Sequence, residues 1–169
     1  FSLSTFDPRF AVCLGFDSSP IGPMIVYGTI ITYMGDNYGG AAYGRLHESA
    51  VRAQGADWER IASDFRQHAL IVAGDFNHHL DGVPGPGTQR TDQSDSDLAA
   101  AFANANLNCV TTADYRHQLD GRRNVDHIAV SESLASHWRI TPSVWKKTTT
   151  DGTVLSDHNA TMITLEPLE

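Results

Sequence analysis

The clearest structural signal in the chain is the segment at residues 70–77, which reads LIVAGDFN. Its first four residues are continuously apolar and predict a short strand that is covered on both faces of a sheet. Gly74 then lets the backbone turn. Asp75 and Asn77 follow on one side of the chain, with Phe76 on the other. A carboxylate and an amide held together here could orient a water molecule, although Asp and Asn are also ordinary turn residues.

A second polar segment lies at residues 124–131, which read NVDHIAVS and predict another strand. Asp126 stands inside an apolar run, where an unpaired carboxylate would be costly. It therefore needs a partner, and an imidazole is a good one. We interpret His127 as an edge or core histidine with a local hydrogen bond.

A third polar segment, LSDHN at residues 155–159, comes directly before a strand-like apolar run at residues 160–165. Asp157 and His158 point to opposite sides of an extended chain. Both can still reach one site if they lie where the backbone bends at the strand mouth. A carboxylate and an imidazole in that position suit metal-assisted or general acid–base chemistry.

The rest of the chain mixes a hairpin, two helical regions and further short strands, which predicts an α+β or layered α/β sandwich. The first helical region extends to about residue 68, and we expect Gly55 to break it in two. Ser94 or Asp95 is the expected cap of the second helix. The further strands are predicted at residues 10–16, 24–33, 109–112 and 138–145.

Composition limits the function classes. The 169 residues are 41% hydrophobic and fit one domain with a real core, and no apolar stretch is long enough to span a membrane. The chain has twelve Lys and Arg but twenty Asp and Glu, and this acidic balance argues against binding of long duplex DNA through many phosphates. A small phosphoester substrate, or a local basic patch at Arg122 and Arg123, remains compatible with this charge.

The two cysteines, Cys13 and Cys109, both stand in apolar surroundings and are interpreted as buried thiols. A disulfide between them is left open by the sequence. The compartment is also left open, with a reducing cytoplasm slightly favoured.

Taken in order, residues 73–77, 125–131 and 156–158 resemble the endonuclease/exonuclease/phosphatase superfamily, which has the DNase I-like fold. Its pattern is a GDFN box, a later strand with Asp, an aromatic or His, and Ile that ends in Ser, and a terminal SDH box. The resemblance covers residues 10–165. It implies a four-layer αββα sandwich and hydrolysis of a phosphoester with Mg²⁺ or Mn²⁺.

The resemblance also implies a role for each motif residue. Asp75 would orient or deprotonate the attacking water, and Asn77 would hold that water or a phosphate oxygen. His158 would contact the scissile phosphate and stabilise its developing charge. Asp126 would hydrogen-bond His158 and raise its pKa. Asp157 would help to bind the metal.

Four further side chains are candidates for binding the substrate: Thr29, Tyr33, His78 and Arg123. The family commonly places a His or Tyr near the end of the strand that contains Thr29, and Tyr33 is close to that position. His78 and the histidine after it could replace a missing metal ligand, but we interpret both as loop histidines at the rim of the site.

The pattern departs from the family at the N-terminus. Family members have a first strand that carries an Asn and a second that ends in a Gln-Glu pair, whose Glu is the main metal ligand. Residues 1–9 supply neither, and Glu48 and Glu59 are interpreted as solvated helix charges. The resemblance therefore predicts an N-terminally truncated fold, in which residues 1–169 form the C-terminal two-thirds. We expect the incomplete sheet to pair with a second copy, or with a segment supplied elsewhere.

The leading hypothesis is a divalent-metal phosphodiester hydrolase, either a nuclease or a phosphoesterase of smaller substrates. The alternative is a non-catalytic truncated scaffold or binding module that has lost the metal-binding Glu. A serine hydrolase built on Ser156 or Ser131 is disfavoured because neither residue lies in a Gly-x-Ser-x-Gly elbow. Substrate identity would depend on the loops at residues 35–44 and 81–95.

Overall fold

The computed structural model describes residues 1–33, 45–83 and 91–169, so the loop at residues 35–44 and part of the loop at residues 81–95 lie outside the described residues. The strands are β1 (Ser2–Leu3), β2 (Ala11–Phe16), β3 (Met24–Ile30), β4 (Ala69–Asp75), β5 (Leu107–Cys109), β6 (Asp126–Ser131), β7 (Trp138–Trp145) and β8 (Ala160–Pro167). The helices are α1 (Arg45–Asp64), α2 (Asp92–Asn104) and α3 (Glu132–Ala135).

A six-stranded mixed sheet with the order β1-β2-β3-β4-β6-β5 forms the centre of the molecule. β2 and β3 form an antiparallel hairpin, as the sequence predicts. The chain then crosses over through α1 to β4, which pairs with β3 in parallel. β4 and β6 pair in antiparallel with Asp75 opposite Asp126. The first two polar segments therefore lie side by side at one end of the sheet.

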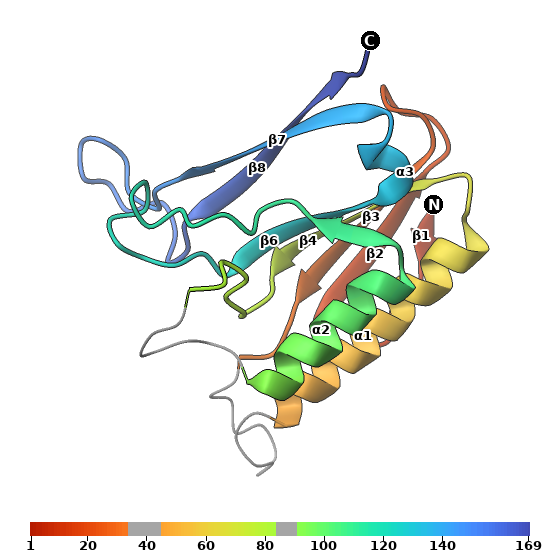
Figure 1. Cartoon of the computed structure of the whole chain (residues 1–169), viewed down its shortest axis with the longest axis horizontal. Helices are drawn as coiled ribbons and strands as arrows, with labels where there is room; N and C mark the ends of the chain where they lie inside the picture. Colours follow the sequence, from red (N-terminus) through yellow and green to blue (C-terminus); the bar gives the residue numbers. More distant parts are fainter. Residues whose placement is uncertain (34–44, 84–90) are drawn as a thin grey trace.

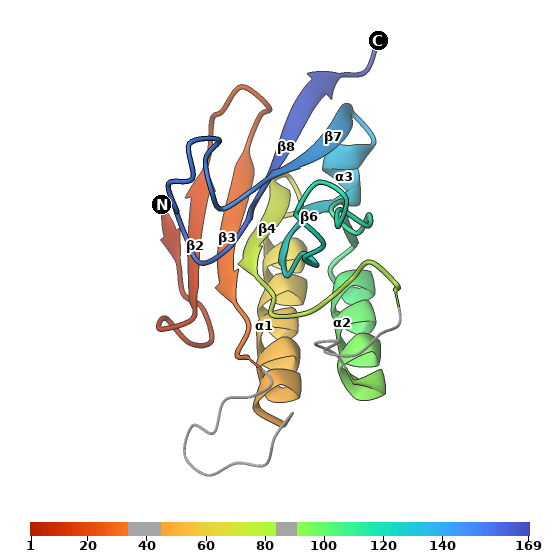
Figure 2. The ribbon, with the colours of Figure 1, turned by 90° about the vertical axis from the view of Figure 1, so that its left-hand side faces the viewer.

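The central strands are covered on both faces. α1 and α2 lie side by side on one face (Figure 1), and the β7–β8 ribbon lies over the other face (Figure 2). Val72 of β4 faces the helices, whereas Ile71 of β4 and Ile128 of β6 pack in the cluster under β7 and β8. This double coverage is what the continuously apolar start of the LIVAGDFN segment predicts.

The expected helix break at Gly55 is wrong, because α1 is continuous from Arg45 to Asp64. A Cβ atom at Gly55 would stand 2.6 Å from the Cβ of Ala101 on α2, so the glycine permits a close approach of the two helices. Trp58 is fully buried nearby and stacks on Phe102 of α2 with ring centroids 5.8 Å apart. This packing outweighs the cost of about 1 kcal/mol for glycine inside a helix.

The expected cap of α2 is also wrong by three residues or more, because the cap is Thr91. The backbone N–H of Ser94 donates to Oγ1 of Thr91 at 3.0 Å, and the backbone N–H of Thr91 donates to Oγ of Ser94 at 2.7 Å. Ser94 therefore serves as the third helical residue of a capping box, not as the cap itself.

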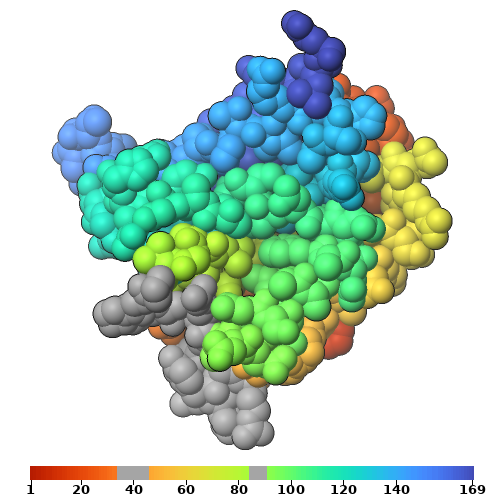
Figure 3. Space-filling view, in the orientation of Figure 1, coloured from red at the N-terminus to blue at the C-terminus, as the bar shows by residue number. Residues whose placement is uncertain are grey.

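The fold is a mixed α/β sandwich, as the sequence predicts. Its layers are the α1–α2 pair, the six-stranded sheet and the β7–β8 ribbon. The two long helices formed by the described residues lie on the same face, so these residues form three of the four layers that the family resemblance implies. Figure 3 shows the segment around residues 110–125, in green to teal, crossing the front of the molecule between the β7–β8 ribbon and α2.

Two smaller expectations concern the cysteines and the membrane. Cys13 and Cys109 are both free thiols, the first buried and the second half-buried. Among the described residues, no helix is both long and apolar enough to cross a membrane.

Candidate active site

β4 ends at Asp75, and two unusual backbone conformations surround that residue. Gly74 has φ of +146°, and a Cβ atom there would stand 2.0 Å from the carbonyl oxygen of Thr29 on β3. Only glycine fits this close approach of the two strands. Asn77 has φ of +47°, a left-handed conformation that asparagine tolerates. The chain therefore turns sharply at the end of the strand and leaves the Asp75 carboxylate at the lip of the sheet.

Asn77 holds the Asp75 carboxylate by both oxygens. Its backbone N–H donates to Oδ1 at 2.8 Å, and its Nδ2 donates to Oδ2 at 2.9 Å. The same Nδ2 also donates to the backbone carbonyl of Ile31 at 2.9 Å. Phe76 points the other way and is fully buried in the core. These contacts fix the direction of the Asp75 side chain.

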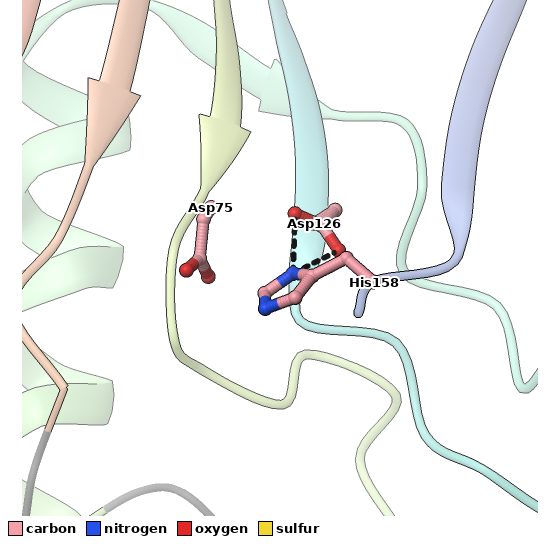
Figure 4. Close-up of side chains that lie close together, drawn as sticks. All are labelled: Asp75, Asp126 and His158. Atoms are coloured by element: carbon pink, nitrogen blue, oxygen red, sulfur yellow. Dashed lines mark hydrogen bonds and ion pairs between the residues drawn. The ribbon is translucent and has the colours of Figure 1, made fainter. Parts of the chain in front are cut away.

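Asp126 and His158 form a direct pair beside Asp75 (Figure 4). The Nδ1 atom of His158 lies 3.2 Å and 3.0 Å from the two carboxylate oxygens of Asp126. An ionised carboxylate only accepts hydrogen bonds, so Nδ1 carries the proton and donates. The other ring nitrogen, Nε2, is turned away from Asp126 and is left for a substrate or another group.

Two hydrogen bonds to Lys147, just after β7, place the SDH segment against that end of the strand. The backbone N–H of Lys147 donates to Oδ1 of Asn159 at 3.0 Å, and the backbone N–H of Leu155 donates to the carbonyl of Lys147 at 2.8 Å. Within the segment, the backbone N–H of His158 donates to Oγ of Ser156 at 3.1 Å. Hydrogen bonds to Lys147 and within the segment therefore fix its position, so that His158 reaches Asp126 on β6.

One group of side chains in the described part of the chain has the spacing of a metal site: Asp75, Asp126 and His158. One potential ligand atom from each lies within 4.8 Å of the others. Asp157, which the resemblance implies as the metal residue, is exposed and stands outside this group. Its Oδ1 accepts a hydrogen bond from Oγ of Ser156 at 3.3 Å.

Burial and mutual charge shift the pKa values of all three groups. Burial raises the pKa of Asp75 above its usual value, against the hydrogen bonds from Asn77. Burial also raises the pKa of Asp126 to about 6, although the charge of His158 opposes this. Burial would lower the pKa of His158, but the carboxylate of Asp126, together with the charges of Asp75 and Asp157, outweighs it and the net shift is upward. The contact with Asp126 therefore favours the charged form of the His158 imidazole.

The donor set fits a divalent cation. Mg²⁺ binds through one or two carboxylates together with water and substrate oxygens, and Mn²⁺ also accepts imidazole. Asp75 and Asp157 each raise the pKa of Asp126 through like charge. A cation beside Asp75 and Asp126 would relieve this repulsion, which is why two carboxylates gathered at one point favour metal binding.

Two of the four substrate-binding candidates are corrected by the structure. Thr29 is 4% exposed and its Oγ1 donates to Gln54 of α1, so it faces the helix layer and not the lip of the sheet. His78 is fully buried and not at a rim. Tyr33, in contrast, is 43% exposed just beyond β3.

His78 belongs to a buried hydrogen-bonded chain. Its Nδ1 lies 3.3 Å from Nε2 of His47, and its Nε2 lies 2.8 Å from Oδ1 of Asp95. Its backbone carbonyl lies 2.9 Å from Nε2 of His127, whose Nδ1 is 3.2 Å from Oγ1 of Thr111. His127 is thus the core histidine that we expected, whereas His78 and His47 anchor the loop that follows Asn77.

A pocket of about 160 Å³ opens beside the pair, lined by residues 122–126 and 157–159. Arg123, the fourth candidate, lines this pocket but is held by Asp81, since its Nε donates to Oδ2 of Asp81 at 2.8 Å. Arg122 lines the same pocket and is exposed. Sequence reasoning noted Arg122 as part of a basic patch but did not place it at the site. Its position two residues before the second polar segment is the signal that could have done so.

Two aspartates and a histidine thus converge at one point from the end of β4, the start of β6 and the segment just before β8. Residues 42–162 match the model of the endonuclease-reverse transcriptase family, Exo_endo_phos_2. The chain therefore belongs to that family, within the endonuclease/exonuclease/phosphatase superfamily. No curated protein matches the sequence.

Solved structures share the fold at low sequence identity. The 3′ phosphatase NExo from Neisseria, bound to a product DNA hairpin, has 16% identity and a TM-score of 0.60 over 96% of this chain and 66% of that one. Beta toxin from Staphylococcus aureus has 15% identity and a TM-score of 0.57 over 93% of this chain and 57% of that one. The endonuclease domain of TRAS1, a telomere-specific non-LTR retrotransposon, has 14% identity and a TM-score of 0.54, over 99% of this chain and 66% of that one. The chain thus spans 57% to 66% of their lengths.

Proposed function

We propose that this chain hydrolyses phosphodiester bonds with an activated water and a divalent cation, Mg²⁺ or Mn²⁺. The observation that supports the proposal is the convergence of Asp75, Asp126 and His158 within 4.8 Å beside an open pocket. Family membership supports the same reaction class. Neighbours with this fold include a phosphatase bound to DNA and an endonuclease, which makes nucleic acid the first substrate to test.

Each side chain has a role that its contacts support. His158 would contact the scissile phosphate through Nε2, because Nδ1 is occupied by Asp126. The raised pKa of His158 favours its charged form, which stabilises negative charge developing on the phosphate oxygens. Asp126 is then a positioning residue, since it sets the tautomer and orientation of the imidazole.

Asp75 would orient the attacking water or accept its proton. Asn77 keeps the Asp75 carboxylate pointed into the site, and its Oδ1 could accept a hydrogen bond from the water, since its two amide N–H groups already donate to Asp75 and Ile31. Asp75 and Asp126 would hold the cation, with Asp157 near enough to contribute charge. A bound divalent cation supplies Lewis-acid stabilisation of a phosphoryl oxygen and lowers the pKa of a water bound to it.

Hydrolysis of bis-p-nitrophenyl phosphate and of plasmid DNA, with Mg²⁺ or Mn²⁺ and with a chelator, tests the proposal. We expect activity that needs the cation and falls by about 10²–10⁴-fold in Asp75→Asn and in His158→Ala. Asp114→Asn and His117→Ala change the same residue types at exposed positions outside the group of three and the pocket lining, and are the matched controls. Hydrolysis of neither substrate, or equal rates in all four variants, would refute the proposal.

The non-catalytic alternative gains some support from the engagement of two of the three candidate ligands, Asp126 and His158, with each other. Calorimetric titration with Mg²⁺ separates the two functions. Binding that disappears in Asp75→Asn supports the enzyme, whereas the absence of binding supports a scaffold.

Self-association with a second copy is a further part of the proposal. Val12, Leu14 and Phe16 alternate along β2 and are 59%, 45% and 40% exposed, on the opposite face from the buried Cys13. Exposed apolar side chains in a row favour association. Light scattering over a concentration series is the test, and a constant monomer mass at high concentration would argue against it.

A further inference from the structure

Three segments far apart in the sequence meet at the rim of the pocket. Nζ of Lys146 donates to Oδ1 of Asp120 at 2.6 Å, which brings the end of β7 to the loop before β6. Nζ of Lys147 donates to the backbone carbonyl of Asp157 at 3.3 Å, which brings it to the SDH segment. Lys146 and Lys147 are the two lysines of the whole sequence. In a chain with a net charge of −8, two consecutive arginines, Arg122 and Arg123, line this pocket, and Lys147 contacts Asp157, another residue of its lining.

These cations differ in what they already contact. Arg123 is closed off, since its side chain is 13% exposed and that of its partner Asp81 is 8% exposed. Lys146 is paired with Asp120. Arg122 is exposed, and within residues 1–33, 45–83 and 91–169 its guanidinium has no hydrogen bond or ion pair. An unpaired guanidinium that lines a pocket presents a fork of N–H donors suited to phosphate oxygens.

The position of the pocket separates Arg122 from the reacting group. Asp126 and His158 line it, whereas Asp75 does not form part of the pocket wall. A phosphate that contacts Nε2 of His158 lies on the Asp75 side, so Arg122 would meet a different part of the substrate.

We infer that Arg122 binds a second phosphate group of the substrate, next to the phosphate that is cleaved. The inference rests on the proposed hydrolase function and deepens it, because it requires a substrate with at least two phosphates. The second phosphate could be an internal diester or a terminal monoester, and the two share the same chemistry towards a guanidinium.

Kinetics on substrates with one and two phosphates test the inference. Bis-p-nitrophenyl phosphate carries one phosphate, TpTpT carries a second as an internal diester, and pTpT carries a second as a terminal monoester. We expect Arg122→Gln to raise KM about tenfold for TpTpT or pTpT, equivalent to about 1.4 kcal/mol. It should leave kcat and KM for bis-p-nitrophenyl phosphate unchanged. The more sensitive of the two oligonucleotides identifies the kind of phosphate.

Two matched variants sharpen the result. Arg122→Lys keeps the positive charge but lacks the forked N–H donors of a guanidinium. Its KM for the two-phosphate substrate should therefore lie between those of the wild type and Arg122→Gln. Arg139→Gln removes the same charge from an exposed side chain on β7, near the opposite end of the strand from Trp145 and roughly 20 Å away at about 3.3 Å per residue. Arg139→Gln should leave kcat and KM unchanged for substrates with one phosphate and with two. A KM increase that is equal for one and two phosphates, or no increase for either, would overturn the inference.

A binding measurement separates this inference from the proposed function. Fluorescence anisotropy of a labelled short oligothymidylate, in the presence of a chelator, needs no turnover. Removing one phosphate contact should reduce the slope of log Kd against log salt concentration by about 0.7 in Arg122→Gln and not in Arg139→Gln. If the protein hydrolyses neither substrate and Arg122→Gln still reduces the slope, the hydrolase proposal is refuted and the phosphate contact is supported. An unchanged slope refutes the contact, whether or not the chain hydrolyses diesters.

Discussion

Acid should destabilise this protein before its surface carboxylates titrate, because two histidines are buried in the neutral form. Burial lowers the pKa of His78 to about 4, with help from the charge of His47. Burial likewise lowers the pKa of His127 to about 4. A histidine with a depressed folded-state pKa contributes stability that is fully present above the unfolded value of 6.5 and is lost as the pH falls towards the folded value.

The size of the effect follows from these pKa values. Between about pH 7.5 and about pH 5, a pKa of 6.5 in the unfolded chain and about 4 in the folded protein costs about 2 kcal/mol for each histidine. Asp126 acts in the opposite direction. Its raised pKa of about 6 destabilises the folded protein at neutral pH, and relief of that penalty on acidification returns about 1 kcal/mol. The two histidines and Asp126 together give an expected loss of about 3 kcal/mol.

Urea denaturation across this pH range measures the loss. His127→Gln keeps hydrogen-bonding groups towards Thr111 and the His78 carbonyl but cannot titrate, so its free energy of unfolding should fall less steeply with acid. His117→Gln removes an exposed histidine and is the control. If the wild type and His127→Gln lose stability in parallel between about pH 7.5 and about pH 5, the burial argument for His127 is wrong.

Three further changes have defined outcomes. Gly74→Ala should destabilise the protein by more than about 2 kcal/mol in urea denaturation, because the new Cβ would stand 2.0 Å from the Thr29 carbonyl at φ of +146°; a smaller loss would mean that β3 and β4 can separate. Gly55→Ala gains about 1 kcal/mol of helix propensity but loses about 1–3 kcal/mol by overpacking between α1 and α2, so thermal melting should show a net loss. Asp126→Asn should lower the pKa of His158, measured from its imidazole NMR signals against pH, since the carboxylate is what raises it; an unmoved midpoint would contradict this.

Local sequence patterns are good predictors of the strands here. The LIVA run, the stretch rich in Ile, Val, Tyr and Thr at residues 24–33 and the apolar stretch after Asp126 each favour a strand from neighbouring residues alone, and β4, β3 and β6 follow. The contact between Asp126 and His158 could also be expected, because a carboxylate inside an apolar run needs a partner. The strands are predictable because their cause acts over a few neighbouring residues. The contact is predictable because few side chains can pair with a carboxylate in that position.

Features that depend on contacts between distant residues were mispredicted. Gly55 was predicted to break the helix, but it lies inside α1, where the close approach of Ala101 on α2 leaves no room for a side chain. Thr29 aligns with a substrate contact in the family, yet it hydrogen-bonds Gln54 under the sheet. His78 reads as a rim histidine but bridges His47 and Asp95 in the interior. Burial of each side chain depends on which element packs over it, and no local pattern carries that information.

The sequence alone therefore specified the central strands, the three ordered boxes and the reaction class to test, because hydrophobic periodicity and motif order are properties of the chain itself. The tertiary structure decided which charged groups share one site. It brought together Asp75, Asp126 and His158 and left Asp157 outside that group. It also paired Arg123 with Asp81, whereas Arg122 lines the pocket with its guanidinium exposed. Coulomb energy and burial depend on distances in space, and residues up to about eighty positions apart acquire those distances only when the strands pair and the loops pack.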